Sequence, residues 1–313
     1  MKTSTEYIPF KAPWWAGNSH VQTIASSFFS QQIKPTVERV EIPTPDDDFL
    51  EVDVALIEGS TTVTVLFHGL EGSSERYYIT NLMHALMQKN SSVVAVNFRG
   101  CGSRINNQPF YYNAGAAYDY QTVFEWVRNT MHPEHLFAVG FSLGANALVK
   151  YQSETGVKSF LDKAVAVSPP FDLKAGSIAL QKGINRLYEL NFLKTLTQKL
   201  EMKRALFPNL PVFTGNSLYD FDDQITAKLH HYDDADHYYR VCSSRYHYGA
   251  VKQPMLIIHS KTDPICPFEY APLQIIDSNP FITPYFMDKG GHVGFWHTEK
   301  NWINRLISDW LMS

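Results

Sequence analysis

The chain has 313 residues, 44% of them hydrophobic and 19% charged, a balance typical of a folded protein with one large α/β domain or a core that carries an insertion. A formal net charge of −4 leaves no general basic field, which argues against nucleic acid as a partner. The three cysteines are scattered and form no CxxC pair, so the sequence favours neither a disulfide framework nor a zinc site.

The N-terminal segment is rich in aromatic side chains but has no continuous apolar stretch, which argues against a secretory signal. The longest apolar runs elsewhere are far too short to span a bilayer. Adjacent tryptophans such as Trp14 and Trp15 rarely both face water, so we expect residues 1–36 to form an arm packed on the domain. The alternative for this arm is a place at the rim of an acyl pocket. Unpaired cysteines and the missing signal predict a cytoplasmic protein, with peripheral contact the only membrane contact left open.

Segments 37–43 and 49–58 alternate apolar and polar residues around a Pro-Asp-Asp-Asp turn, a pattern typical of an antiparallel hairpin. We expect its three aspartates to lie in a solvated turn, with calcium binding as the weaker alternative. From residue 62 onward, short apolar runs alternate with stretches of helical periodicity. The predicted strands are 62–67, 93–98, 136–141 and 164–168, and the predicted helices are 76–88, 116–131 and 143–152. This alternation predicts a mostly parallel sheet with helices on both faces.

The alternation stops at residue 172, and no buried strand is evident before residue 250. The stretch 178–206 is helical and basic, and we expect its lysines and arginines to form a solvated face. The Asp- and His-rich stretch 219–240 matches no metal-binding spacing, so we expect capping and charge pairing at helix ends. The sequence therefore predicts a core at 37–171 and 250–313 that is interrupted by a helical cap at 172–249.

The sheet pattern resumes in the last quarter of the chain. A buried strand at 255–259 is followed by a helix at 268–277, a strand at 282–287 and an amphipathic helix at 299–311. The closing helix places Trp302 and Trp310 on one side, as expected of a helix packed on the sheet.

The pentapeptide Gly140-Phe141-Ser142-Leu143-Gly144 joins a predicted strand to a predicted helix. A serine becomes a useful nucleophile when such a sharp turn lifts its hydroxyl group out of the sheet and a histidine takes its proton. The backbone N–H of Leu143 at the start of the helix can donate to a developing oxyanion. The turn His68-Gly69-Leu70, which follows the strand at 62–67, is the candidate source of a second donor, the N–H of Leu70.

The histidine and the acid that such a serine needs occur in the right order. Asp263 follows the strand at 255–259, and His292 lies in a glycine-flanked loop after the next strand. The carboxyl ends of parallel strands meet at one edge of a sheet, so Ser142, Asp263 and His292 are predicted to meet there. We expect the glycines beside His292 to let its loop bend toward the serine. These roles need no metal and no organic cofactor.

The chain resembles the YheT-like branch of the α/β-hydrolases, which contains bacterial esterases and eukaryotic ABHD1- and ABHD3-type lipases. The resemblance rests on residues from nearly the whole chain: Pro13-Trp14-Trp15, His20, Gln22-Thr23, His68 to Gly72, Asn97 to Cys101, Gly140 to Gly144 with Asn146, Phe221-Asp222-Asp223, Thr226, Asp263-Pro264 and Gly291-His292. It implies an α/β-hydrolase fold, a triad of Ser142, Asp263 and His292, and activity on carboxylic esters or lipids.

The predicted function is that of a short- to medium-chain carboxylesterase or acylglycerol lipase that forms an acyl-enzyme. One rival is an acyltransferase that passes the acyl group to an alcohol through the same triad, as some fungal members of this group do. The other is a binding protein that keeps the fold without catalysis. The sequence does not specify the acyl-chain length, which depends on how the cap closes.

Overall fold

The computed structural model describes residues 9–29 and 31–313, without the side chains of residues 27–29. Residues 1–8 of the predicted arm lie outside this part of the chain. The described residues contain an eight-stranded sheet in the order β1-β2-β4-β3-β5-β6-β7-β8. Pairing is antiparallel from β1 to β4 through β2 and parallel across the rest of the sheet. The strands are β1 (Glu38–Pro43), β2 (Phe49–Ala55), β3 (Thr62–Phe67), β4 (Ser92–Asn97), β5 (His135–Phe141), β6 (Lys163–Val167), β7 (Met255–Ser260) and β8 (Ile282–Met287).

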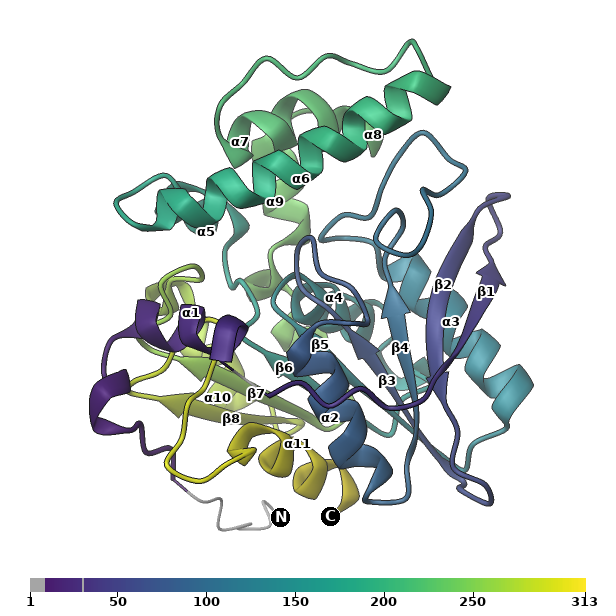
Figure 1. Ribbon diagram of the computed structural model, residues 1–313, viewed down its shortest axis with the longest axis vertical. Helices are drawn as coiled ribbons and strands as arrows, with labels where there is room; N and C mark the ends of the chain where they lie inside the picture. Colours follow the sequence, from purple (N-terminus) through teal and green to yellow (C-terminus); the bar gives the residue numbers. More distant parts are fainter. Residues whose placement is uncertain (1–8, 30) are drawn as a thin grey trace.

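Helices cover both faces of the sheet, as the α/β alternation predicts (Figure 1). One face packs against α2 (Tyr77–Met87) and α11 (Trp302–Met312). The other packs against α3 (Ala117–Met131), α4 (Leu143–Thr155) and α10 (Leu273–Ser278). The predicted helix at 268–277 is wrong in its first part, because the chain before Pro272 is extended and only a short 3-10 turn, η6 (Phe268–Tyr270), precedes α10.

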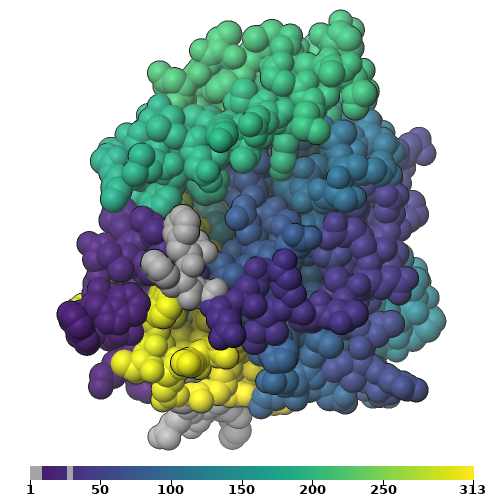
Figure 2. Space-filling view, in the orientation of Figure 1, coloured from purple at the N-terminus to yellow at the C-terminus, as the bar shows by residue number. Residues whose placement is uncertain are grey.

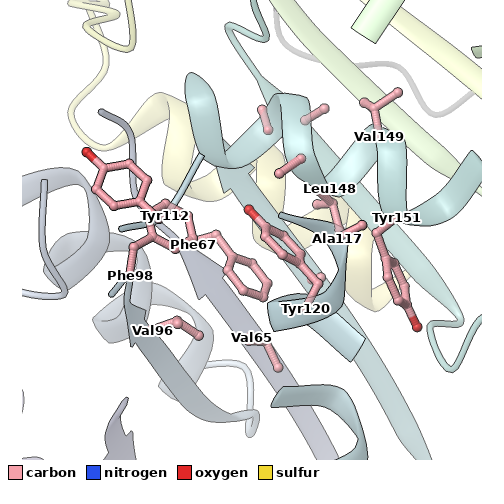
Figure 3. Close-up of a cluster of buried hydrophobic side chains, with 14 of the residues drawn as sticks. Val65, Phe67, Val96, Phe98, Tyr112, Ala117, Tyr120, Leu148, Val149 and Tyr151 are labelled. Carbon is pink, nitrogen blue, oxygen red and sulfur yellow. The ribbon is translucent and has the colours of Figure 1, made fainter. Parts of the chain in front are cut away.

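An aromatic stack links the sheet to the turn that follows β5 (Figure 3). The ring of Phe67 on β3 stacks on Tyr120 of α3, with ring centres 3.8 Å apart, and also on Phe98. The hydroxyl of Tyr120 is buried and donates to the carbonyl oxygen of Gly144 at 2.7 Å. The apolar core therefore fixes the backbone of this turn through a hydrogen bond that water does not reach.

Six helical segments and no strand occupy the stretch between β6 and the short turns that precede β7. They are α5 (Leu173–Leu180), α6 (Asn185–Leu206), α7 (Leu218–Phe221), the π-helix η3 (Asp222–Thr226), α8 (Ala227–Leu229) and α9 (Ala235–Cys242). In Figures 1 and 2 these green segments lie together above the body of the molecule. We call residues 172–249 the insertion.

Two lysines of α6 point inward, so the prediction of a solvated basic face is wrong for them. Lys203 is buried and donates to the carbonyl oxygens of Asn106, at 2.6 Å, and Gln108. Burial lowers the pKa of Lys203 to about 8. Lys199 forms an ion pair with Glu71 at 2.9 Å. The sequence pattern misses both because their partners lie about 100 residues away in the core.

The aspartate turn between β1 and β2 also differs from its prediction as a solvated loop. Asp48 is 4% exposed, and its carboxylate accepts from Arg99 at 2.9 Å. Asp46 and Asp119 accept from the same guanidinium, each at 2.7 Å. Arg99 is almost fully buried, so this arginine, which follows β4, anchors the hairpin to the core.

The N-terminal arm contains the 3-10 turn η1 (Trp14–Ala16) and helix α1 (Ser19–Phe29). Trp14 is 95% exposed, contrary to the expectation that the tryptophans avoid water. Trp15 is partly covered and meets Trp296 edge to face, with ring centres 5.2 Å apart. The arm contacts the rest of the chain through Gln22, which is fully buried and is hydrogen-bonded to the backbone of Trp296. None of the described helices combines the length and apolarity that a membrane span requires.

Candidate active site

Ser142 occupies the sharp turn between β5 and α4. Its backbone has φ 52° and ψ −119°, a conformation that residues with a side chain rarely adopt. A carbon in place of the Gly140 side-chain hydrogen would lie 2.5 Å from the carbonyl oxygen of Gly144. A carbon on Gly144 would lie 2.4 Å from the carbonyl oxygen of His68. Both glycines are therefore required because α4 and the turn after β3 pack directly against them.

The three residues predicted to meet at the sheet edge do so. His292 Nε2 lies 2.8 Å from Ser142 Oγ, and His292 Nδ1 lies 2.9 Å from Asp263 Oδ2. The second carboxylate oxygen of Asp263 accepts the backbone N–H groups of Ile265 and Cys266, each at 2.9 Å. Burial favours the neutral acid, but the charge and hydrogen bond of His292 outweigh it and hold the pKa of Asp263 below its usual value.

The two predicted oxyanion donors flank the serine. A carbon on Gly69 would lie 3.1 Å from Ser142 Cβ, so the turn after β3 runs directly beside the serine. Leu70 and Leu143 both line the cavity that contains Ser142. Within the described residues, neither backbone N–H donates to another group. Both residues thus line the cavity that contains Ser142, and their N–H groups have no hydrogen-bond partner among the described residues.

His68 shapes this turn rather than exchanging protons with Ser142. Its Nδ1 lies 2.7 Å from the carbonyl oxygen of Gly69, and its Nε2 accepts the backbone N–H of Phe98 at 3.2 Å. Because Nε2 accepts, the proton of the neutral ring is on Nδ1, which donates to Gly69. Full burial lowers the pKa of His68 to about 3, so the ring stays neutral.

Glu71, the residue after Leu70, connects the turn to the insertion. Its backbone has φ 53°, and its N–H donates to the hydroxyl of Tyr112 at 2.8 Å. That hydroxyl donates in turn to the Glu71 carboxylate at 2.8 Å, which also accepts from Lys199 of α6. The sequence analysis did not predict the contacts of Lys199 and Tyr112 with this turn. The only sequence signal for this contact is that Glu71 belongs to the residues on which the family resemblance rests.

A cavity of about 770 Å³ lies between the sheet edge and the insertion. Ser142 and His292 form part of its floor, and Thr23 and Ile24 of α1 also line it. Its remaining lining is largely apolar, and the insertion contributes a large share of it, including Leu173, Leu180, Phe192, Leu196, Leu218 and Phe221. This volume and lining suit a ligand with an apolar chain and a few polar atoms.

The motif residue Asp222 lies in the cavity wall. Its carboxylate accepts from the hydroxyls of Tyr239 and Thr226, each at 2.7 Å. No Lys, Arg or His of the described residues pairs with it. Burial raises the pKa of Asp222 to about 6. The spacing from Asp222 to Thr226, one helical turn, is the sequence signal that points to this contact.

Other acids of this stretch cap helices or pair with charged groups, as predicted, and Asp236 forms an ion pair with Lys174 at 2.8 Å. Ser217 and Asp220 form a reciprocal capping box at the start of α7. Asp234 accepts the backbone N–H of His237 at 2.6 Å at the start of α9.

One group of potential metal ligands exists among the described residues: Asp263, Cys266 and His292, whose ligand atoms lie within 4.8 Å of one another. Burial raises the pKa of the Cys266 thiol well above its usual value, so the sulfur keeps its proton. Both ring nitrogens of His292 are already hydrogen-bonded. These residues fit a hydrogen-bond relay better than a metal site.

The sequence profile of the α/β hydrolase fold family matches residues 63–298, from β3 to the loop after His292. The chain belongs to this family. The chain is 34% identical to YheT of Escherichia coli (strain K12), a protein named provisionally as an esterase. The alignment covers 99% of this chain and 94% of YheT. This similarity places the chain in the YheT-like branch that the sequence motifs indicate.

More distant similarities agree with this assignment. A monoacylglycerol lipase of Saccharomyces cerevisiae is 26% identical over 96% of this chain, which spans 64% of the yeast protein. The structure of the Pyrococcus furiosus esterase Pf2001 superposes with a TM-score of 0.60 at 18% identity, covering 90% of this chain and 98% of that one. At this sequence identity the superposition shows that the two folds are similar and carries no information on function.

Proposed function

We propose that this chain, an esterase- or lipase-type α/β hydrolase, cleaves carboxylic esters through Ser142, His292 and Asp263 by way of an acyl-enzyme. The observation that carries the proposal is the continuous relay from Ser142 Oγ through both ring nitrogens of His292 to Asp263, with distances of 2.8 and 2.9 Å. These are the contacts that a serine nucleophile, a general base and an orienting acid require.

In the first step, Ser142 Oγ attacks the ester carbonyl while His292 Nε2 takes its proton. Asp263 keeps the other ring proton on Nδ1 and stabilises the imidazolium. The N–H groups of Leu70 and Leu143 stabilise the oxyanion, each by roughly 3 kcal/mol. When the tetrahedral intermediate collapses, His292 gives its proton to the leaving alcohol and the acyl group stays on Ser142.

In the second step, the oxygen of a water molecule attacks the acyl carbonyl while His292 removes a proton from that water. Collapse of this second intermediate returns the proton to Ser142 and releases the carboxylic acid. An alcohol in place of water would give a new ester, so the same residues also serve an acyltransferase. The partition between the two acceptors decides which activity dominates.

The substrate class follows from the cavity. Its largely apolar lining, with the serine on the floor, suits a short to medium acyl chain or an acylglycerol. The name of the yeast monoacylglycerol lipase supports the second choice. We further propose residues 172–249 as the cap over this cavity, 37–171 and 250–313 as the hydrolase core, and 1–36 as an arm. Cytoplasmic localisation stays a prediction.

A series of p-nitrophenyl esters from acetate to palmitate tests the proposal on purified protein. We expect turnover of the shorter esters and covalent labelling by a fluorophosphonate probe, with both lost in Ser142→Ala. Ser177→Ala is the matched control, because Ser177 also lines the cavity but lies on α5, outside the relay. A wild-type chain that neither turns over any ester nor takes the probe contradicts the proposal.

Product analysis with added ethanol separates hydrolase from acyltransferase. A hydrolase gives mostly free acid from the acyl-enzyme, whereas an acyltransferase gives mostly ethyl ester. Wild-type levels of ester turnover in Ser142→Ala would instead show that another residue carries the reaction.

A further inference from the structure

The loop that carries His292 contacts the N-terminal helix through its backbone. The N–H of His292 donates to Thr23 Oγ1 at 2.8 Å. The Thr23 hydroxyl donates in turn to the carbonyl oxygen of Ser19, also at 2.8 Å, one turn earlier in α1. The threonine is thus fixed by its own helix and fixes the backbone of the histidine, which is 269 positions away in the chain.

Gln22, the neighbour of Thr23, makes a second set of contacts to the same loop. Its side chain is fully buried, and its Nε2 donates to the carbonyl oxygens of Ala16, at 2.8 Å, and Trp296, at 3.2 Å. Its Oε1 accepts the N–H of Trp296 at 2.5 Å. One amide therefore satisfies both backbone groups of a residue four positions after His292, in a place that water does not reach.

Two glycines of the loop show how closely α1 approaches it. A carbon on Gly291 would lie 2.5 Å from the backbone nitrogen of Thr23, and a carbon on Gly294 would lie 2.5 Å from the carbonyl oxygen of Gln22. Neither glycine has a positive φ, whereas Val293 between them has φ 60°. Gly291 and Gly294 are therefore required for helix contact, whereas Gly290, with φ 149°, has a backbone conformation that favours glycine. The expectation that the glycines let the loop bend is wrong for Gly291 and Gly294 only. Figure 1 shows the purple helix α1 against the yellow segment that leads to α11.

The core holds the loop from the opposite side. The N–H of Val293 donates to Ser168 Oγ at 3.2 Å, and Ser260 Oγ donates to the carbonyl oxygen of Gly290 at 3.1 Å. Ser168 directly follows β6, and Ser260 is the last residue of β7. The histidine loop is therefore bonded to the sheet on one side and to α1 on the other.

We propose that Thr23, supported by Gln22, is a positioning residue that sets the reach of His292 Nε2 toward Ser142 Oγ. The inference rests on the proposed function, because it assigns the geometry of the general base. The hydrogen bond acts on the backbone of His292 itself, so its loss moves the point from which the imidazole extends. A base displaced by a fraction of an ångström still binds to Asp263 but transfers protons from Ser142 less efficiently.

The test compares Thr23→Val, which keeps the shape of the side chain and removes its hydroxyl, with Thr23→Ser, which keeps the hydroxyl. We expect Thr23→Val to lower kcat on p-nitrophenyl butyrate about tenfold, with KM within about twofold. Thr23→Ser should stay within about twofold of the wild type. Thr130→Val is the matched control, because Thr130 makes the same bond to the carbonyl four residues back, in α3.

A merely structural role predicts another pattern, which active-site titration with a fluorophosphonate reveals. If Thr23→Val lowers only the fraction of folded protein, then kcat per titrated site stays at the wild-type value and the proposal is overturned. The proposal requires that kcat per site falls and that the rate of fluorophosphonate labelling falls with it, because labelling also depends on proton removal from Ser142.

A double variant shows whether Thr23 acts through the histidine. In a His292→Ala background, Thr23→Val should cause no further loss of the residual rate, since its effect runs through the absent imidazole. A second tenfold loss in that background overturns the proposal. Failure of the proposed function is distinguishable, because the wild-type chain would then lack labelling at Ser142 altogether.

Discussion

The turn that carries Ser142 and the loop that carries His292 are built in opposite ways. The serine turn takes its strained backbone from glycines within its own pentapeptide, and it packs against the start of α4, the turn after β3 and Tyr120 of α3. The histidine loop has no regular structure; the ends of two strands hold it on one side, and Thr23 and Gln22, about 270 positions away, hold it on the other. The glycines that the nucleophile requires therefore lie in its own motif and pack on the core, whereas the loop of its base is held in addition by the folded N-terminal arm.

The largest effect should come from filling the space at the serine turn. Gly144→Ala places a carbon 2.4 Å from a backbone carbonyl that cannot move without shifting β3. We expect a loss of about 10³-fold in ester hydrolysis and of about 2 kcal/mol in the free energy of unfolding. Hydrolysis assays and urea unfolding measure the two effects.

Gly249→Ala is the control for that variant. A carbon on Gly249 would lie 3.7 Å from Ile275, an ordinary van der Waals distance, so activity should be retained. Wild-type activity in Gly144→Ala would show that the serine turn is less constrained than its contacts indicate.

The corresponding change in the histidine loop should have a smaller effect. Gly291→Ala places a carbon 2.5 Å from the backbone nitrogen of Thr23 and forces α1 and the loop apart. We expect kcat to fall about 10²-fold and the free energy of unfolding to fall by about 1 kcal/mol, because the arm can move more readily than the sheet. Gly17→Ala, in open space just before α1, should behave as wild type. A larger stability loss than that of Gly144→Ala would reverse the comparison.

The turn after β3, His68 to Glu71, shares features of both regions, since it is a short local turn but Lys199 of the insertion forms an ion pair with Glu71. Lys199→Met keeps the apolar stem and removes the charge. We expect kcat to fall about fivefold on every ester, because displacement of Leu70 weakens one of two oxyanion donors. Lys194→Met, on the exposed side of the same helix, is the control. An effect confined to long-chain esters would assign Lys199 to substrate binding.

The smallest effect should appear in the pH dependence of stability. The folded Asp222 carboxyl has a pKa of about 6, against an ordinary value of 3.8. Between these values the folded state holds more protons than the unfolded one, so stability rises as the pH falls from 6 toward 4. Above pH 6 the free-energy cost of burying the charged Asp222 carboxylate no longer changes with pH. Asp222→Asn should remove this rise, which is about 1 kcal/mol between pH 6 and pH 5, in urea unfolding at several pH values. Titratable groups facing it from α9 are Tyr238, Tyr239 and Cys242.

Much of the fold and of the candidate site could be predicted from the sequence. Strands β3 and β8 have the predicted bounds, and most other elements of the core differ by one to three residues. The periodicity of buried side chains is a local property, so it can be read from neighbouring residues. The order of Ser142, Asp263 and His292 along the chain gave the site, because each follows a strand whose carboxyl end reaches the same edge of the sheet.

The orientation of charged side chains could not be predicted in this way. Asp48, Lys199 and Lys203 look like surface residues in their own segments, yet each is directed to a partner in the core. A buried charge is tolerated only where a partner group compensates the cost of its desolvation. Which group becomes that partner depends on how distant segments of the chain pack together. Helical periodicity alone carries no such information.

By itself, the sequence determined the alternation of strands and helices, the strained serine turn and the identity of the three relay residues, because these depend on spacing and local sterics. Only the tertiary structure decided that α1 contacts the loop of His292, that the insertion holds the turn after β3 through Lys199, and that Gly291 and Gly294 make room for helix contact. Those features depend on hydrogen bonds and close packing between segments far apart in the chain, which no local pattern specifies.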